Sequence, residues 1–168
     1  MAIAQTLLPE FDQEMASTRK LLEVVPAADA AWKPHPRSTS LGELAAHIAT
    51  IPLWAKVVVE QPELDLGLPA NAALSQTPFT TVPELLERFD RHVRDTRAAL
   101  GSVADGAMGV TWTLKNRGTA VFSIPRAAAL RRFIMSHLIH HRGQLSVYLR
   151  LRDVPLPSLY GPTADTRR

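Results

Sequence analysis

The sequence predicts an all-α fold, a four-helix bundle with long crossover-type loops, and three observations support this prediction. Four segments repeat apolar residues with a helical period. Capping signals open two of these segments, and prolines follow the first and the last. Only one short stretch elsewhere has a strand-like composition. Four amphipathic helices can bury their apolar faces together in a bundle.

The first two predicted helices cover residues 3–25 and 41–60. The apolar stripe of the first consists of Leu7, Phe11, Met15, Thr18 and Leu22. A capping box opens the second helix, because the Ser40 hydroxyl can accept a free backbone N–H and Glu43 can reach back. Pro52 removes one backbone hydrogen bond inside this helix, so we expect a kink there.

The third and fourth predicted helices cover residues 82–100 and 126–152. Thr81 and Glu84 form a second capping box in front of the third helix. Pro155 prevents the fourth helix from continuing. The fourth helix carries a long inward stripe formed by Leu130, Phe133, Ile134, His137, Leu138, His141, Leu145, Tyr148 and Leu149.

The predicted linkers are long for a helical bundle, in which connections of roughly 2–8 residues are usual. They cover residues 26–39, 61–81 and 101–124. The third contains two short β-rich stretches, 109–114 and 119–124, separated by the turn signal Lys-Asn-Arg-Gly. We therefore expect a small β-hairpin between the third and fourth helices.

Composition indicates one globular domain over residues 1–168, with 46% apolar and 21% charged residues. The chain has 0 Cys, which excludes disulfides, Cys-ligated metal sites and a cysteine nucleophile. No apolar run approaches the ~18 residues of a membrane span. The first residues lack a basic segment typical of signal peptides, so we expect a cytoplasmic protein with no membrane partner.

The two halves of the chain differ in charge. Residues 1–84 carry 5 Lys/Arg and 10 Asp/Glu, whereas residues 85–168 carry 14 and 6. A basic half can bind nucleic acid, but acidic residues interleave with the arginines of the third helix and no nucleic-acid motif is present. We expect a solvated surface or a basic rim around a pocket, and no nucleic-acid partner.

Three of the 6 histidines form a candidate metal site. His137 and His141 are one helical turn apart on the inward stripe, and His47 lies on the inward stripe of another helix. The alternative is a set of core histidines bonded to the backbone or to each other. Three imidazoles leave a coordination position open for water or substrate, as in catalytic zinc sites. We interpret His35 and His92 as structural or exposed. His140 could pair with His137 at i, i+3, but His141 fits the apolar stripe better.

Two stretches resemble the DinB-like proteins, a family of metal-binding four-helix bundles. Residues 32–49, from Trp32 to Ala49, resemble the first half of the family. Residues 137–150 resemble its last helix, and residues 155–161 resemble its tail. The resemblance implies a homodimer with a divalent metal held by His47, His137 and His141, the ligands chosen above from the residues alone.

The resemblance also suggests an activity, since the family includes thiol S-transferases that use low-molecular-weight thiols. We hypothesise an enzyme in which zinc or nickel activates such a thiol, or water, for attack on an electrophilic small molecule. Imidazole ligands also suit copper and iron. The alternative is a non-catalytic, stress-related protein that binds a small molecule or uses the metal structurally.

Candidate substrate-binding residues are Trp54, Arg142 and Tyr148. Trp54 and Tyr148 could line the mouth of the bundle, with core packing as the favoured alternative for each. Arg142, Arg131 or Arg132 could orient an acidic thiol, with a solvated surface position as the alternative. No general base and no other catalytic motif is evident in the sequence.

Overall fold

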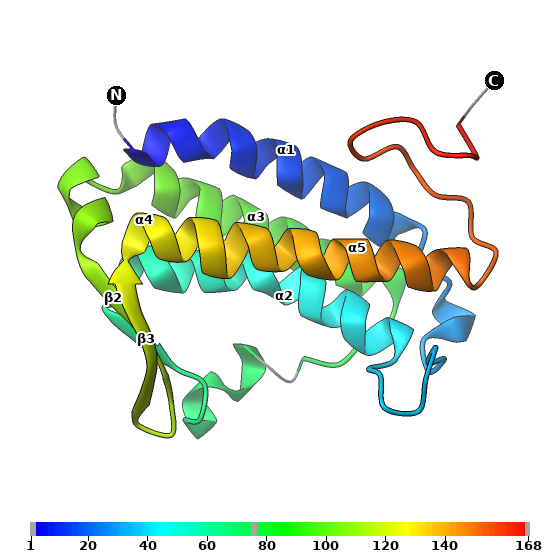
Figure 1. The fold of residues 1–168 in the computed structure, drawn as a ribbon, viewed down its shortest axis with the longest axis horizontal. Helices are drawn as coiled ribbons and strands as arrows, with labels where there is room; N and C mark the ends of the chain where they lie inside the picture. Colours follow the sequence, from blue (N-terminus) through cyan, green and yellow to red (C-terminus); the bar gives the residue numbers. More distant parts are fainter. Residues whose placement is uncertain (1–2, 75–76, 167–168) are drawn as a thin grey trace.

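The computed structural model describes residues 3–74 and 77–166, and it shows long helices lying side by side with a small sheet near one end (Figure 1). Residues 75–76 of the expected linker 61–81, and residues 1–2 and 167–168 of the expected domain, lie outside the described residues. The elements in chain order are α1 (Ile3–Glu23), the 3-10 turn η1 (Ala27–Asp29), α2 (Leu41–Glu60), β1 (Glu63–Asp65), the 3-10 turn η2 (Pro69–Leu74), α3 (Val82–Ser102), the 3-10 turn η3 (Asp105–Gly109), β2 (Thr111–Asn116), β3 (Thr119–Pro125), α4 (Arg126–Ala129), the π-helical turn η4 (Leu130–Met135) and α5 (Ser136–Arg150).

The predicted helix boundaries hold to within two residues. The capping box of α2 is present, because Ser40 Oγ accepts from the Glu43 N–H at 3.2 Å and the Glu43 carboxylate accepts from the Ser40 N–H at 2.6 Å. The second predicted box is only half formed. Thr81 accepts from the Glu84 N–H at 3.3 Å, but the Glu84 carboxylate bonds the Thr80 hydroxyl instead. Helix α2 remains one continuous helix through Pro52.

Helix α2 lies against α3 and α5, and α1 covers the other side of α3 and α5 (Figure 1). By length and composition α2 could span a membrane, but 72% of its most apolar window is buried inside the protein. An internal helix of a globular core has the same character. The inward stripes named for the first and fourth predicted helices are buried or half-buried.

The sheet corrects the all-α prediction, because the protein is mostly helical with a three-stranded sheet in the order β1-β2-β3. Strands β2 and β3 form the expected antiparallel hairpin. Arg117 and Gly118 at its tip have φ of 50° and 79°, the left-handed conformation that a two-residue hairpin turn requires. Strand β1 pairs in parallel with β2, and the sequence pattern did not predict this strand.

The carboxylate of Asp65 joins β1 to the hairpin turn. It accepts backbone N–H groups from Gly67 at 2.8 Å, Arg117 at 2.8 Å and Gly118 at 2.6 Å. Burial acts to raise the pKa of Asp65, but these three donors outweigh it and lower the pKa. Gly67 lies so close to the turn that an added Cβ would be 2.4 Å from the backbone nitrogen of Arg117.

The predicted fourth helix is not uniform. It contains the π-helical turn η4 between α4 and α5, which ends two residues before His137. A π-helical turn accommodates one additional residue and rotates the side chains that follow. Helical periodicity in the sequence does not reveal such a turn, so the continuous α-helix predicted for residues 126–152 was wrong at this point.

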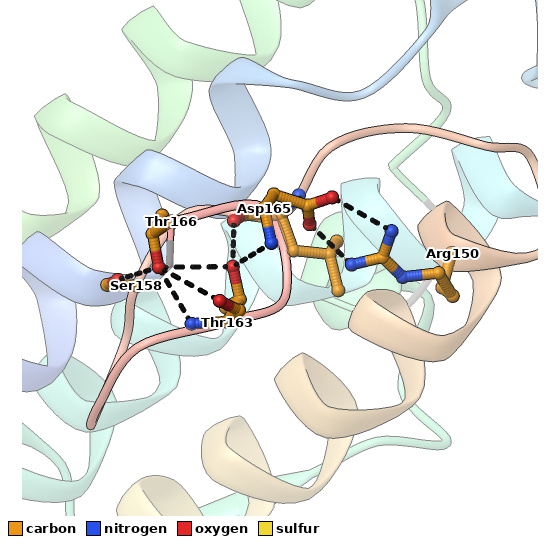
Figure 2. Close-up of polar contacts among 6 residues, drawn as sticks. Arg150, Ser158, Thr163, Asp165 and Thr166 are labelled. Carbon is orange, nitrogen blue, oxygen red and sulfur yellow. Dashed lines mark hydrogen bonds and ion pairs between the residues drawn. The ribbon is translucent and has the colours of Figure 1, made fainter. Parts of the chain in front are cut away.

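The segment after α5 folds back along the helices (Figure 1). Asp165 accepts from the Arg150 guanidinium and from the Leu156 N–H at 2.9 Å. Figure 2 shows this ion pair beside a hydroxyl cluster in which the Thr166 side chain contacts Ser158 and Thr163. These donors lower the pKa of Asp165 to about 2, with Arg150 as the largest cause.

Candidate metal centre

Three imidazole rings from two helices converge on one point. Nε2 of His137 on α5 lies 2.7 Å from Nε2 of His141, one turn further along the same helix. It also lies 3.4 Å from Nε2 of His47 on α2. One ligand atom from each histidine falls within 4.8 Å of the other two, so the structure brings together all three residues that the sequence predicted as ligands.

The donor set and its spacing fit a divalent transition metal. Two nitrogens that bind zinc at about 2.05 Å in tetrahedral geometry lie about 3.35 Å apart. The His47–His137 separation of 3.4 Å matches this value, whereas the His137–His141 separation of 2.7 Å is shorter and also suits a hydrogen bond between the two rings. Three imidazoles leave at least one coordination position for another ligand.

All three rings are held in the neutral form that metal binding requires. Burial, followed by the charge of His141, lowers the pKa of His47 to about 4. Burial and the neighbouring histidines lower the pKa of His137 to about 4 as well. Burial also lowers the pKa of His141. Neutral imidazoles keep a lone pair available at neutral pH.

Gln144 orients His141, a role that the sequence analysis missed. Its Oε1 lies 2.7 Å from His141 Nδ1, so this nitrogen donates and Nε2 is left as the free acceptor. The i, i+3 spacing on α5 is the sequence signal that could have identified it. Nδ1 of His137 is buried and has no hydrogen-bond partner among the residues that the structure describes.

A cavity of about 770 Å³ opens beside the cluster and includes His47 and His141 in its wall. Its other described lining residues are Ala30, Thr39, Ser40, Gly42, Glu43, Thr50, Leu74, Thr77, Pro78 and Phe79. The wall is largely apolar, and Glu43 is its one charged side chain among the described residues. Hydrogen bonds from Ser40, led by its backbone N–H, lower the pKa of Glu43, so its carboxylate is ionised and engaged in the helix cap.

Trp54 and Tyr148, two predicted substrate residues, lie close to this region. The indole N–H of Trp54 donates to the Leu74 carbonyl at 2.8 Å, and its ring centroid lies 5.5 Å from that of His47. Trp54 is only 4% exposed and supports the cluster from inside the core. The Tyr148 hydroxyl donates to the Thr39 carbonyl at 3.4 Å, at the cavity wall.

Arg142, the third predicted substrate residue, is not brought to the cavity. It is 1% exposed and pairs with Glu14 on α1. Its guanidinium also donates to the Thr18 hydroxyl at 3.2 Å and to the Tyr160 hydroxyl of the C-terminal segment. The physical reason is helical geometry, because each residue rotates by about 100° and Arg142 therefore faces α1 when His141 faces α2. The sequence predicted either a substrate contact or a solvated surface position for Arg142. The buried pair with Glu14 is neither of these.

The other three histidines lie outside the cluster. His92 is buried on α3, with Nδ1 3.0 Å from the Ala49 carbonyl. His35 is exposed and accepts the Arg37 N–H at 3.2 Å. His140 is exposed, and its ring lies edge-on to His141 at 5.0 Å between centroids. The positions of His35 and His92 agree with the exposed and structural roles expected for them, and His141 rather than His140 joins the cluster.

Comparison with known proteins relates the whole arrangement to one family. The family model of the DinB superfamily matches residues 10–145. A DinB-like protein from Bacillus subtilis superposes with a TM-score of 0.68 at 24% identity, covering 92% of this chain and 97% of that one. A DinB-like protein from Bacillus cereus ATCC 10987 superposes with a TM-score of 0.69 at 20% identity, covering 93% and 97%. No curated protein matches the chain.

Proposed function

Because the chain belongs to the DinB superfamily and its three inward histidines share one point, we propose that it is a divalent-metal-dependent enzyme acting on small molecules. His47, His137 and His141 hold the metal, and zinc or nickel fits their imidazole donors. The convergence of the three Nε2 atoms is the observation that carries the proposal.

A metal bound here lowers the pKa of a water or thiol at its open position and so supplies a nucleophile near neutral pH. The protein residues contribute the surroundings. Gln144 fixes the ring orientation of His141, and Trp54 packs behind His47. The 770 Å³ cavity has room for an organic substrate, and its apolar wall limits water around the reacting groups.

Within this class we propose a thiol S-transferase that joins a low-molecular-weight thiol to an electrophilic substrate. The cavity gives the electrophile an apolar site directly beside His47 and His141. Among the described residues of its wall there is no free carboxylate to serve as a general base. That feature favours a thiol, which ionises more easily than water, as the activated group.

The lack of a free carboxylate among the described residues of the cavity wall also supports a second candidate. This is a non-catalytic protein in which the metal is structural or helps to hold a ligand. The two candidates differ in what chelation does. A structural metal gives a large fall in melting temperature on EDTA treatment, whereas a catalytic metal gives loss of turnover with a smaller fall.

Metal analysis of untagged protein tests the metal site first. We expect about one metal per chain in wild type and loss of most of it in His47→Ala and His141→Ala. His140→Ala is the matched control, because this exposed histidine neighbours His141 but lies outside the cluster. Equal metal content in all four proteins would exclude the site.

Thiol-dependent conjugation of monochlorobimane tests the activity. We expect turnover with at least one low-molecular-weight thiol, loss of turnover with EDTA and no loss in His140→Ala. Absence of turnover across several thiols with metal bound would exclude the transferase and leave the binding protein.

The assembly and location of the protein are part of the proposal. We propose that the four long helical segments form a four-helix bundle in a single domain, that two chains associate as a homodimer, and that the protein is cytoplasmic with no membrane or nucleic-acid partner. Light scattering at micromolar concentration tests the dimer, because a monomer mass would contradict it.

A further inference from the structure

We propose that a second small-molecule pocket, on the His137 side of the histidine cluster, binds planar apolar anions. This pocket is a cavity of about 260 Å³ lined by Phe122, Arg132, Phe133 and His137. It brings a residue of strand β3 next to two residues of the π-helical turn η4 and one of α5. The proposal goes beyond the metal site, because binding here needs no metal.

The pocket is separate from the large cavity. The two share no lining residue within the described chain. His47 and His141 face the large cavity, whereas His137 faces this pocket, so the cluster forms a wall between them. A ligand in the second pocket therefore approaches the cluster from a different side than a ligand in the first.

Two phenylalanine rings give the pocket rigid aromatic walls. Phe122 and Phe133 meet edge to face, with centroids 5.6 Å apart and planes at 69°. Phe133 also stacks on Trp54 at 5.2 Å and 17°, and lies 5.8 Å from the fully buried Trp112. Because the neighbouring rings hold Phe133 in place, its side chain gives the pocket a rigid aromatic wall.

The charge of the pocket comes from Arg132. This side chain is exposed, and its guanidinium makes no hydrogen bond or ion pair with any residue of the described chain. The preceding Arg131, in contrast, pairs with Glu10 of α1 at 3.3 Å. No carboxylate lines the pocket within the described chain, so Arg132 is left to pair with an anionic group of a ligand.

The π-helical turn η4 supplies two of the four lining residues. Arg132 and Phe133 both belong to η4, and His137 follows on the first turn of α5. Single π-helical turns within helices are frequent at functional sites, because they present side chains that a regular helix would rotate away. Within this turn Phe133 stacks on Trp54 and lines the pocket, whereas Arg131 pairs with Glu10 of α1.

Calorimetric titration with 2-naphthoate tests the proposal, with neutral 2-naphthylmethanol as the comparison ligand. The experiment uses the protein both as purified and after EDTA treatment. Arg132→Gln removes the proposed anion contact, and Arg131→Gln is the matched control, since it removes the same charge one residue earlier from a different contact.

We expect wild type and Arg131→Gln to bind 2-naphthoate equally, with and without metal. Arg132→Gln should bind it about tenfold more weakly and bind 2-naphthylmethanol unchanged. Phe122→Ala should weaken both ligands. No binding of 2-naphthoate by wild type, or equal binding by the two arginine variants, would overturn the proposal. Metal content is measured separately on the same samples, so failure of this pocket and failure of the metal site are distinguishable.

Discussion

Gln144 follows His141 by about one turn of α5, and its Oε1 lies 2.7 Å from Nδ1 of His141. This hydrogen bond decides which imidazole nitrogen carries the proton and directs Nε2 of His141 toward His137. A residue outside the histidine cluster thus sets the orientation of one of its rings.

Replacing Gln144 with alanine should weaken metal binding without unfolding the protein. Loss of a partner that orients a ligand typically costs about 10-fold to 100-fold in metal affinity. Gln144 is exposed, so its removal leaves the core intact. Competition with a chromophoric chelator measures the affinity. Gln144→Glu keeps an acceptor at the same place and should retain wild-type affinity, and equal affinity of Gln144→Ala would contradict the orienting role.

Replacing Glu14 with alanine should destabilise the fold strongly. Glu14 is 5% exposed and Arg142 is 1% exposed, so the substitution leaves a buried guanidinium without its counter-charge. Breaking a buried pair in this way costs about 3–5 kcal/mol, measurable by urea unfolding. Glu10→Ala on the same helix is the control. It breaks the exposed pair with Arg131 and should cost at most about 1 kcal/mol.

The double variant Glu14→Leu/Arg142→Leu tests whether the uncompensated buried charge causes the loss of stability. Removing both charges together leaves no uncompensated ion, so it should be more stable than Glu14→Ala. If the single and double variants lost the same free energy of unfolding, the buried charge would not be the cause.

Lowering the pH below about 4 should remove the stabilisation that ionised Asp165 gives to the folded protein. Because Arg150 lowers the folded-state pKa of Asp165 to about 2, below the ordinary value of about 3.9, ionised Asp165 stabilises the folded tail at pH above about 4. This stabilisation is lost as the pH falls from about 4 toward 2. Comparison of wild type with Asp165→Asn by thermal unfolding should show a constant difference above pH 4 that shrinks below it. A difference independent of pH would contradict the assignment.

Two glycines should respond in opposite ways to alanine. At Gly67 the new Cβ would meet the backbone of Arg117, which cannot move without disturbing the hairpin turn, so we expect a loss of about 1–3 kcal/mol. At Gly101, inside α3, nothing lies within 4 Å of the new Cβ, and the better helix propensity of alanine should gain about 0.5 kcal/mol. Urea unfolding measures both, and a neutral Gly67→Ala would show that the turn is adaptable.

Local sequence patterns were sufficient for the helices and for the choice of the three histidines. Periodic apolar residues and the Ser40 cap define α2 because both depend on neighbours within a few residues. His47, His137 and His141 were identified in the same way, since each lies on a stripe that must face inward.

Local sequence patterns did not predict the contacts between segments that are distant in the sequence. Strand β1 has only three residues, and it exists because β2, about fifty residues later, offers it an edge to pair with. The burial of Arg142 depends on Glu14 from the first helix and Tyr160 from the tail. The π-helical turn and the two cavities beside the histidines likewise arise when the helices pack, because side chains from separate elements must share one volume. Short-range periodicity carries no information about these encounters, so the helices and the three inward histidines could be predicted from the chain, while their surroundings required its three-dimensional packing.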